Sequence, residues 1–145
     1  MYQINVMSES DKEIIVSWHY PAPYQLYDLT ADDFNGEYDF FSVFDDDQLV
    51  GMLKLHYNEG TCHLGLGLRP DLTGKGHGQH FVEAAVQLVK EQGYQSIQLA
   101  VISSNERAIK VYERCGFVEK DYELMLAGDV LEEFLIMQYG EEDCF

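Results

Sequence analysis

Basic residues are scarce in this sequence. Nine Lys and Arg residues stand against 26 Asp and Glu residues, and the formal net charge is −17. A protein that binds DNA or RNA needs a basic surface to neutralise phosphates, so the composition argues against a nucleic-acid partner. Long apolar runs are also absent. None approaches the ~20 residues that span a bilayer, and we expect no membrane partner.

Cysteines are few, and no metal-ligand spacing is visible. Cys62, Cys115 and Cys144 are far apart and odd in number, which is typical of reduced thiols in the cytosol rather than of a disulfide framework. We therefore expect no metal site. The segment Met1–Asn5 has neither the basic nor the apolar part of a signal peptide. We expect a soluble, cytoplasmic protein with a single domain over residues 1–145.

The acidic residues are unevenly distributed. Residues 69–120 contain seven basic and six acidic side chains, whereas the rest of the chain contains two basic and 20 acidic ones. A segment spared of negative charge suits a binding site for an anionic ligand. The alternative is that the acidic surface serves only solubility.

Hydrophobic patterns predict an α+β fold of mixed α/β type. A helical pattern from Phe81 to Val89, ended by Gly93, lies between predicted strands at 61–68 and 96–102. Strand, helix and strand make a βαβ unit, so these two strands should be parallel neighbours. We expect a mixed sheet of about seven strands with about four helices. The predicted strands cover residues 2–7, 38–44, 49–57, 61–68, 96–102, 118–126 and 133–139.

Two further helices are predicted from capping signatures, in which Ser or Thr precedes an acidic residue by three positions. Ser10 with Glu13 predicts the start of one, and Thr30 with Asp33 predicts a short helix near residues 31–35. One face of the first helix would comprise Ile14, Ile15 and Trp18.

Three glycines alternate between the strand at 61–68 and the helix that follows it. Gly74, Gly76 and Gly78 leave no side chains in the way of a ligand, so successive backbone N–H groups can point into one cavity at a helix N-terminus. Such a site suits a pyrophosphate, and Lys75 could add charge at its rim. The loop matches neither the Walker A motif nor the G-x-G-x-x-G spacing of dinucleotide-binding folds. A tight structural turn is the alternative.

The strand at 61–68 has an unusual face. His63, Gly65 and Gly67 share one side, and glycine weakens the interior of a strand. Two glycines on one face therefore indicate that another group approaches closely there, although a bulge or a tightly packed helix would also explain them. The opposite side is apolar and comprises Cys62, Leu64, Leu66 and Leu68.

A last helix is predicted to begin at Asn105 and to end at Gly116. Asn105 and Tyr112 are seven residues apart, hence on one side of the helix and about 10.5 Å apart along its axis. Both residues also have simpler explanations, Asn105 as an N-cap and Tyr112 as a core aromatic residue.

These segments together resemble the GNAT superfamily of N-acetyltransferases. The matching residues are Leu66–Pro70, Gly74–Gly78 and Asn105–Phe117. The resemblance implies the GNAT fold, with acetyl-CoA wedged between strands that splay apart at Leu68 and Val101. The family's loop commonly begins with Arg or Gln where this chain has Thr73, so we expect a weaker phosphate contact there. The implied cofactor-binding residues are Leu66, Gly67, Leu68, Thr73, Gly74, Lys75, Gly76, His77, Gly78, Gln79 and Asn105.

The resemblance also implies direct attack of an amine on the thioester. Tyr112 would then face the sulfur and act as general acid for the departing thiolate. A base must first take the ammonium proton, because a free amine with a pKa near 10.4 is nearly all protonated at pH 7. The family often uses a carboxylate near the central strand, and Glu59 and His63 are the candidates here. We favour His63 because its ordinary pKa is near neutral, with a packed strand histidine as the alternative.

Four aromatic residues lie where the family places the loop that covers the acceptor. Aromatic rings together with the nearby Asp28, Asp32 and Asp33 suit a cationic amine. The alternative is a hydrophobic loop packed on the sheet. The candidate substrate-binding residues are Trp18, Tyr20, Tyr24 and Tyr27.

The sequence thus predicts an N-acetyltransferase that transfers the acetyl group of acetyl-CoA to a primary amine of a cationic small molecule. Alternatives are an acetyltransferase for protein N-termini or Lys side chains, a non-catalytic acyl-CoA-binding sensor, and a nucleotide-binding module. The expected partners are acetyl-CoA and the amine acceptor, and a homodimer is one option for assembly.

Overall fold

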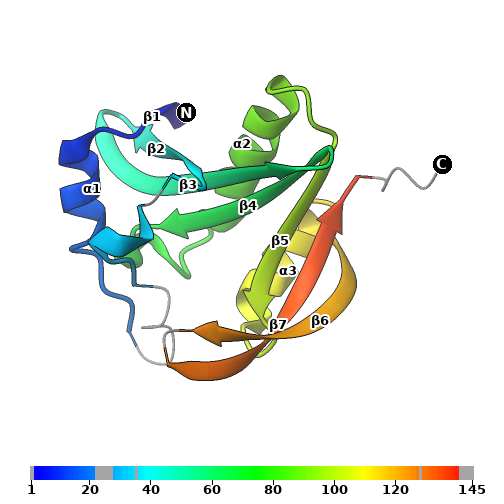
Figure 1. Cartoon of the computed structure of the whole chain (residues 1–145). Helices are drawn as coiled ribbons and strands as arrows, with labels where there is room; N and C mark the ends of the chain where they lie inside the picture. The colour runs from blue at the N-terminus through cyan, green and yellow to red at the C-terminus, as the bar shows by residue number, and fades with distance from the viewer. Residues whose placement is uncertain (1, 22–27, 35, 128, 141–145) are drawn as a thin grey trace.

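The computed structural model describes residues 2–21, 28–34, 36–127 and 129–140. They form one seven-stranded sheet in the order β1-β2-β3-β4-β5-β7-β6 (Figure 1). The predicted mixed fold of about seven strands is confirmed, and the described residues contain three α-helices and two 3₁₀ helices where about four helices were expected. The strands are β1 (Tyr2–Val6), β2 (Asp39–Asp45), β3 (Gln48–Asn58), β4 (Thr61–Leu68), β5 (Ser96–Ile102), β6 (Val118–Ala127) and β7 (Val130–Tyr139). The helices are α1 (Glu9–Ile15), η2 (Ala31–Asp33), η3 (Pro70–Leu72), α2 (Gly78–Glu91) and α3 (Glu106–Arg114).

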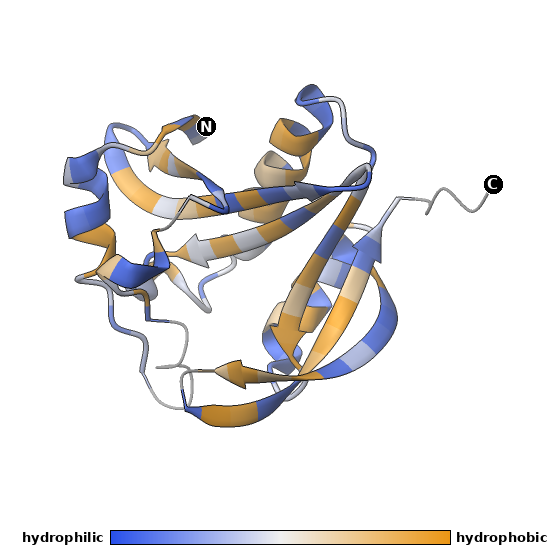
Figure 2. Ribbon diagram, viewed as in Figure 1, coloured by the Kyte–Doolittle hydropathy of each residue, from blue (hydrophilic) through white to orange (hydrophobic). Residues whose placement is uncertain are grey.

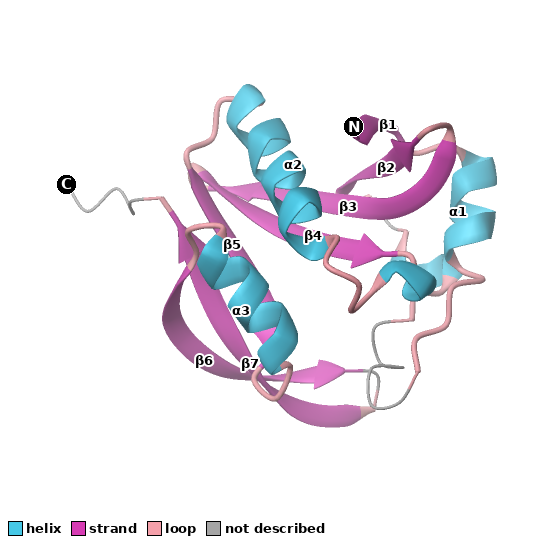
Figure 3. Cartoon of the chain, turned by 180° about the vertical axis from the view of Figure 1, so that it is seen from behind, coloured by secondary structure: helices cyan, strands magenta, loops and turns pink. Residues whose placement is uncertain are grey.

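The helices α2 and α3 cover one face of the sheet (Figure 3). The apolar side of α2 packs on the central strands and forms the main core with them, because residues three and four apart share one side of a helix. Its buried residues are Phe81, Val82, Ala85, Val86 and Val89. The helix is followed by Gly93 at a φ of +96°, a left-handed conformation that glycine adopts without strain. No described helix is long and apolar enough to cross a membrane.

The helix α1 lies against the other face of the sheet, where a second and smaller core forms. Its buried residues come from α1, from the segments flanking α1 and from β3. They are Met7, Ile15, Trp18, Leu49 and Met52. Trp18 is therefore a packed residue that is 8% exposed, and it follows α1 rather than lying on it.

The predicted cap of α1 is wrong by two residues. Ser8 is the N-cap, because its Oγ accepts a hydrogen bond from the Asp11 N–H at 3.1 Å and Asp11 Oδ2 accepts one from the Ser8 N–H at 3.2 Å. Ser10 with Glu13 fits the same local pattern. The Ser42 hydroxyl of β2 donates to the Asp11 carboxylate at 2.7 Å, and this tertiary contact favours the earlier cap.

The second predicted cap is confirmed, and the helix it begins is a single 3₁₀ turn. The Asp33 carboxylate accepts a hydrogen bond from the Thr30 N–H at 2.7 Å. The turn ends at Asp33, so it is shorter than the predicted helix near residues 31–35.

The parallel pair in the middle of the sheet parts halfway along β4. Pairing between β4 and β5 ends at His63 and Gln98, whereas the other edge of β5 pairs with β7 from Ile97 to Ile102. Figure 1 shows β4 and β5 diverging beyond this point. The predicted parallel neighbours are therefore confirmed, and they separate before Leu68, as expected.

Candidate active site

The backbone of the second half of β4 points into the gap between β4 and β5. Arg69, directly after β4, donates its N–H to the Val50 carbonyl of β3 at 2.8 Å. Residues that exchange hydrogen bonds with one neighbouring strand alternate with residues whose N–H and C=O point to the other side. The β3–β4 register is unbroken from the Gly51–Leu68 pair to the Asn58–Thr61 pair. The residues whose N–H and C=O face the gap are therefore Leu64, Leu66 and Leu68.

The glycine loop follows at the same end of β4 and leads into α2. Gly74 has a φ of +72° and Gly76 a φ of +86°, conformations that other residues adopt only with strain. The helix begins without a side-chain cap on its N-cap residue His77 and without an acidic residue in its first turn. Its first N–H groups and its positive dipole end thus suit an anion, as a pyrophosphate site requires.

One side of α3 faces this loop and the start of α2. Arg107 meets the loop. Val111 and Cys115, at successive spacings of four residues, meet the first residues of α2. A Cβ atom at Gly74 would lie 2.6 Å from a guanidinium nitrogen of Arg107, and one at Gly78 would lie 3.4 Å from Val111. Arg107 is a cation beside the anion site that the sequence reading missed. Its i, i+4 spacing from Val111 was the signal that could have revealed it.

The two residues singled out on α3 have structural roles. Asn105 is 7% exposed, and its Oδ1 accepts a hydrogen bond from the Ala108 N–H at 3.3 Å, so it is the N-cap. Tyr112 is half-buried and lies edge-on against Phe117, with 5.9 Å between ring centroids. The cofactor contact of Asn105 and the proton transfer by Tyr112 stay predictions.

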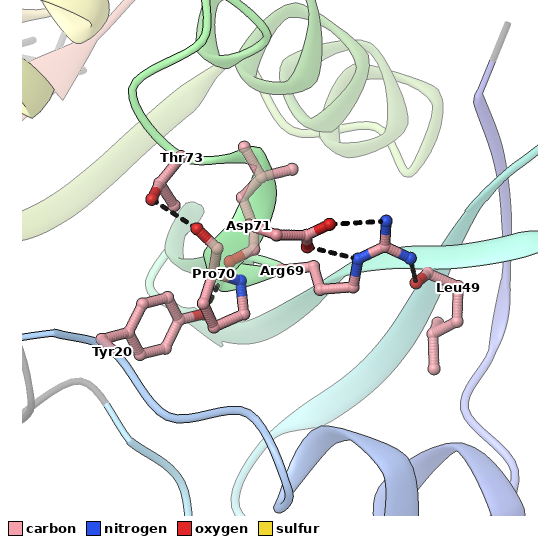
Figure 4. A network of polar contacts seen from close by, with 7 residues as sticks. Tyr20, Leu49, Arg69, Pro70, Asp71 and Thr73 are labelled. Carbon is pink, nitrogen blue, oxygen red and sulfur yellow. Dashed lines mark hydrogen bonds and ion pairs between the residues drawn. The ribbon is translucent and has the colours of Figure 1, made fainter.

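A polar network fixes the turn between β4 and the glycine loop (Figure 4). Arg69 donates to the Asp71 carboxylate at 2.6 and 3.2 Å and to the Leu49 carbonyl at 3.3 Å. The hydrogen bond from Arg69 lowers the pKa of Asp71, so this pair stays ionised at neutral pH. Thr73 donates its hydroxyl proton to the Pro70 carbonyl at 2.7 Å. The Thr73 hydroxyl proton is thus used within the turn, and the contact of Thr73 with a phosphate stays a prediction.

The glycine face of β4 lies on the side of the sheet away from α2. A Cβ atom at Gly65 would lie 2.5 Å from two carbons of Lys54, and one at Gly67 would lie 3.1 Å from Met52. Side chains of the neighbouring strand β3, rather than a bulge or a helix, therefore occupy the space that the glycines leave. This side of the sheet, on which α1 also packs, is called the open face below.

His63 lies on the open face beside His56 of β3, with 6.1 Å between the ring centroids. Burial lowers the pKa of His63, and the nearby His56 and Lys120 lower it further. His63 is therefore neutral at pH 7 and able to accept a proton. The other candidate base, Glu59, is exposed in the β3–β4 turn, at the opposite end of β4 from the glycine loop.

The four aromatic candidates for acceptor binding have different positions. Trp18 is packed in the second core. Tyr20 is half-buried, and its hydroxyl donates to the Leu68 carbonyl at 2.7 Å. Burial, with a smaller effect of Asp28, raises the pKa of Tyr20 to about 12, so the phenol stays protonated. Tyr24 and Tyr27 lie outside the described residues.

Comparison with known proteins agrees with this geometry. A family model described as the acetyltransferase (GNAT) family matches residues 4–117. The mycothiol acetyltransferase of Streptomyces coelicolor is 34% identical over 116 residues, which are 74% of this chain and 37% of that protein. The chain thus spans well under half the length of this relative. The spermidine N(1)-acetyltransferase of Vibrio cholerae is 27% identical over 134 residues, 84% of this chain and 72% of that protein.

A solved structure has the same fold. The spermidine N-acetyltransferase from Vibrio cholerae, in complex with CoA and spermine, superposes with a TM-score of 0.79 at 18% sequence identity, over 96% of this chain and 95% of that one. The family model covers most of the chain, and the sheet, the gap beside β4 and the glycine loop are arranged as the motifs of that family predict. The chain belongs to the GNAT family of acetyltransferases.

Proposed function

We propose that this protein is an N-acetyltransferase that transfers the acetyl group of acetyl-CoA to a primary amine. The observation that carries the proposal is the gap between β4 and β5, which leads directly to the glycine loop at the start of α2. The gap presents a row of backbone donors and acceptors, and the loop presents N–H groups at a positive helix end. An extended thiol ester with a pyrophosphate matches both features at once.

The binding of acetyl-CoA would use three parts of this site. The gap-facing backbone of Leu66 and Leu68 would bond the pantetheine arm, in the manner of an added strand. The N–H groups of residues 74–79 would hold the pyrophosphate, and Arg107 beside Gly74 would add a positive charge. Residues 69–120, which include the loop, α2 and α3, are also the part of the chain without excess negative charge.

The chemical step would need a proton acceptor for the amine and a proton donor for the thiolate. His63 on the open face is neutral at pH 7 and suits the first role. Tyr112 of α3 suits the second. Acetyl transfer then proceeds by attack of the neutral amine on the thioester carbon, and the C–S bond breaks as the thiolate takes the Tyr112 proton. The nitrogen loses its extra proton as the amide forms, and this proton restores the Tyr112 phenol.

A cationic small molecule is the acceptor that the charge distribution favours. Outside residues 69–120 the chain has 20 acidic and two basic side chains, a field that attracts cations. A relative that is 27% identical is named a spermidine acetyltransferase, which supports the same class of acceptor.

An acceptor that also bears an anionic group is the second candidate, and one local observation favours it. Lys54, one of those two basic residues, lies on the open face across Gly65, on the same side as His56 and His63. Its ammonium lies 4.7 Å from the Tyr38 ring centroid. This ammonium would attract a carboxylate or phosphate on the acceptor.

The acceptor class is tested with three amines that share a four-carbon chain: putrescine, its amino-alcohol analogue and γ-aminobutyrate. We expect putrescine to release free CoA fastest. Its advantage in kcat/KM over the other two amines should shrink as ionic strength rises, because salt screens the acidic surface. A preference for γ-aminobutyrate would instead select the second candidate. If acetyl-CoA binds but no amine causes the release of free CoA, the protein is a non-catalytic sensor.

Cofactor binding through the glycine loop is tested with Gly76→Asp. A negative charge beside a phosphate costs about 1–4 kcal/mol at ~4 Å, so the Kd of acetyl-CoA measured by calorimetry should rise roughly 5- to 1,000-fold. The matched control is Gly60→Asp. Gly60 has a φ of +83° and the same free space around it, but it lies in the β3–β4 turn. Equal Kd values for the two folded variants would place the pyrophosphate elsewhere.

The role of Tyr112 is tested with Tyr112→Phe, which keeps the ring packed against Phe117. Removal of a general acid should lower kcat by about 10²- to 10⁴-fold with little change in the Kd of acetyl-CoA. Thermal unfolding measured in parallel separates catalysis from stability. Wild-type turnover in a stable variant would leave Tyr112 as a packing residue only.

The role of His63 is tested through the pH profile of kcat/KM. The pKa of His63 is below its ordinary value of about 6.5, so the base form prevails at pH 7 and activity should fall only on the acid side of that value. The same shift means that protonation of His63 destabilises the fold, so circular dichroism must confirm folding at each pH. His63→Gln should lower kcat and abolish the acid limb, and Glu59→Gln should change neither. The reverse result would make Glu59 the base.

A further inference from the structure

Exposed apolar side chains gather on the hairpin of β6 and β7. Tyr122, Leu124 and Leu126 alternate along β6, so they lie on one face of the sheet, and they are 53%, 66% and 71% exposed. These three residues are called the apolar row below. Figure 2 shows the end of β6 and the start of β7 as hydrophobic. Of the eight large apolar side chains that are exposed in the described residues, six belong to this hairpin: Val118, Tyr122, Leu124, Leu126, Val130 and Leu131.

The strand β6 forms one edge of the sheet. In the part of the chain that the structure describes, β6 pairs with β7 and with no other strand. It has ten residues, whereas β1, the strand at the other edge, has five. A long edge strand presents a row of backbone N–H and C=O groups that can pair with another chain, and a short edge strand is one way to avoid this. That protection is missing from β6.

The backbone groups that face outward from β6 belong to the apolar row. Ser103 donates its N–H to the Glu133 carbonyl at 3.0 Å, so the backbone groups of Glu133 point from β7 toward β5. In an antiparallel ladder the direction alternates, so those of Phe134 point toward β6 and bond its register partner Glu123. The residues that alternate with Glu123 are those of the apolar row. Their N–H and C=O groups therefore point away from β7.

The two halves of β6 differ in how well they resist pairing. A register shift between Glu119 and Asp121 marks a bulge near the start of the strand, where Lys120 also lies. Bulges and lysines both keep edge strands from pairing with other chains. Residues 121–127 contain no lysine and no proline, and they pair regularly with β7. The half of β6 that is open to pairing is therefore the half with the apolar row.

We propose that this half of β6 pairs with the same half of β6 in a second copy of the chain, antiparallel and about a twofold axis at Leu124. Leu124 then lies opposite its own copy and Tyr122 lies opposite Leu126, and the backbone groups of the two apolar rows bond each other. The two seven-stranded sheets become one continuous sheet. A twofold axis uses the same surface of both copies, so the contact closes as a dimer and does not extend into a fibre. This inference does not depend on the proposed acetyltransferase function.

The acidic residues of β6 select this register. In the register centred on Leu124, Glu123 lies opposite Met125. Asp121 lies opposite Ala127, so no acidic residue of the paired half faces another. Centred one apolar residue earlier, the pairing would place Asp121 opposite Glu123, and like charges directly opposite each other are destabilising. Centred one apolar residue later, it would be shorter, because β6 ends at Ala127.

The face of the apolar row has little charge to oppose a second copy. The side chains of Asp121 and Glu123 alternate with the row, so they lie on the opposite face of the sheet. Glu133 of β7 shares the face of the row as the register partner of Leu124. Three strand spacings, about 14 Å, would separate Glu133 from its copy, which is more than the Debye length of about 10 Å at 0.1 M salt. A second copy supplies what the row lacks, an apolar surface and backbone partners of matching length.

The experiment measures self-association by sedimentation equilibrium for wild type and for Leu124→Lys. The substitution removes two leucines from the contact and places two ammonium groups opposite each other, so the Kd of the dimer should rise by about 10²- to 10⁴-fold. The matched control is Val6→Lys, because Val6 is 78% exposed on β1, the other edge strand. This control should leave the Kd unchanged. Thermal unfolding shows whether both variants are folded.

Salt distinguishes a second copy from a basic partner protein. Each copy has a net charge of −17, so two copies repel and the Kd of the dimer should fall as ionic strength rises. A surface that binds a basic protein instead would leave the wild type monomeric at protein concentrations up to about 1 mM, and this result would overturn the proposal.

A cross-link tests the register without depending on Leu124→Lys. Leu124→Cys would place two thiols across a hydrogen-bonded pair whose Cα atoms are about 5.5 Å apart, within the range of a disulfide, so oxidation should give a covalent dimer. Glu123→Cys is the control, since Glu123 and its copy would be diagonal neighbours about 7–8 Å apart, too far for a disulfide. Wild type oxidised in parallel corrects for the native thiols of Cys62, Cys115 and Cys144.

The combined outcomes decide both the surface and the register. A Kd raised by Val6→Lys and not by Leu124→Lys would place the contact on β1 and overturn the proposal. A covalent dimer from Glu123→Cys and none from Leu124→Cys would overturn the twofold axis at Leu124.

Discussion

The site depends on one constraint, which is that β5 pairs with β7 along its length but with β4 over three residues only. Backbone N–H and C=O groups require partners, and the second half of β4 presents ladder positions toward the gap that β5 does not pair. A ligand with amide groups can complete the ladder there. The glycine loop, the start of α2 and the side of α3 that bears Arg107 are all arranged around the open end of this gap.

Charge is partitioned in the same way as the fold. The segment that forms the loop, α2 and α3 has nearly balanced charge, while the strands and loops around it have most of the 26 acidic residues. Ligands of opposite charge would thus be attracted to different parts of the protein. Lys54 on the open face is a local exception to this partition, and it makes the charge of the proposed acceptor the most informative property to measure.

Much of the fold follows from local patterns. The bounds of β4 and β5 agree with the alternation of their residues, and the turn at Thr30 begins with the capping box expected there. The cap of α1 does not follow from the local pattern, because the pairs Ser8 with Asp11 and Ser10 with Glu13 fit the same rule. A hydrogen bond from Ser42 of β2 to Asp11 favours the first pair. The burial of Trp18 in the second core favours the alternative that this residue packs on the sheet over its prediction as a substrate contact.

By itself the sequence determined the glycine positions that permit left-handed turns, the helical faces and the βαβ order, since each depends on neighbouring residues. Only the tertiary structure decided which side chains meet the site. Arg107 meets Gly74 because α3 packs along the start of α2, and Tyr20 meets Leu68 because the segment after α1 crosses the open face of β4. Such contacts join residues far apart in the chain, and their partners are set by packing and strand register rather than by local propensity.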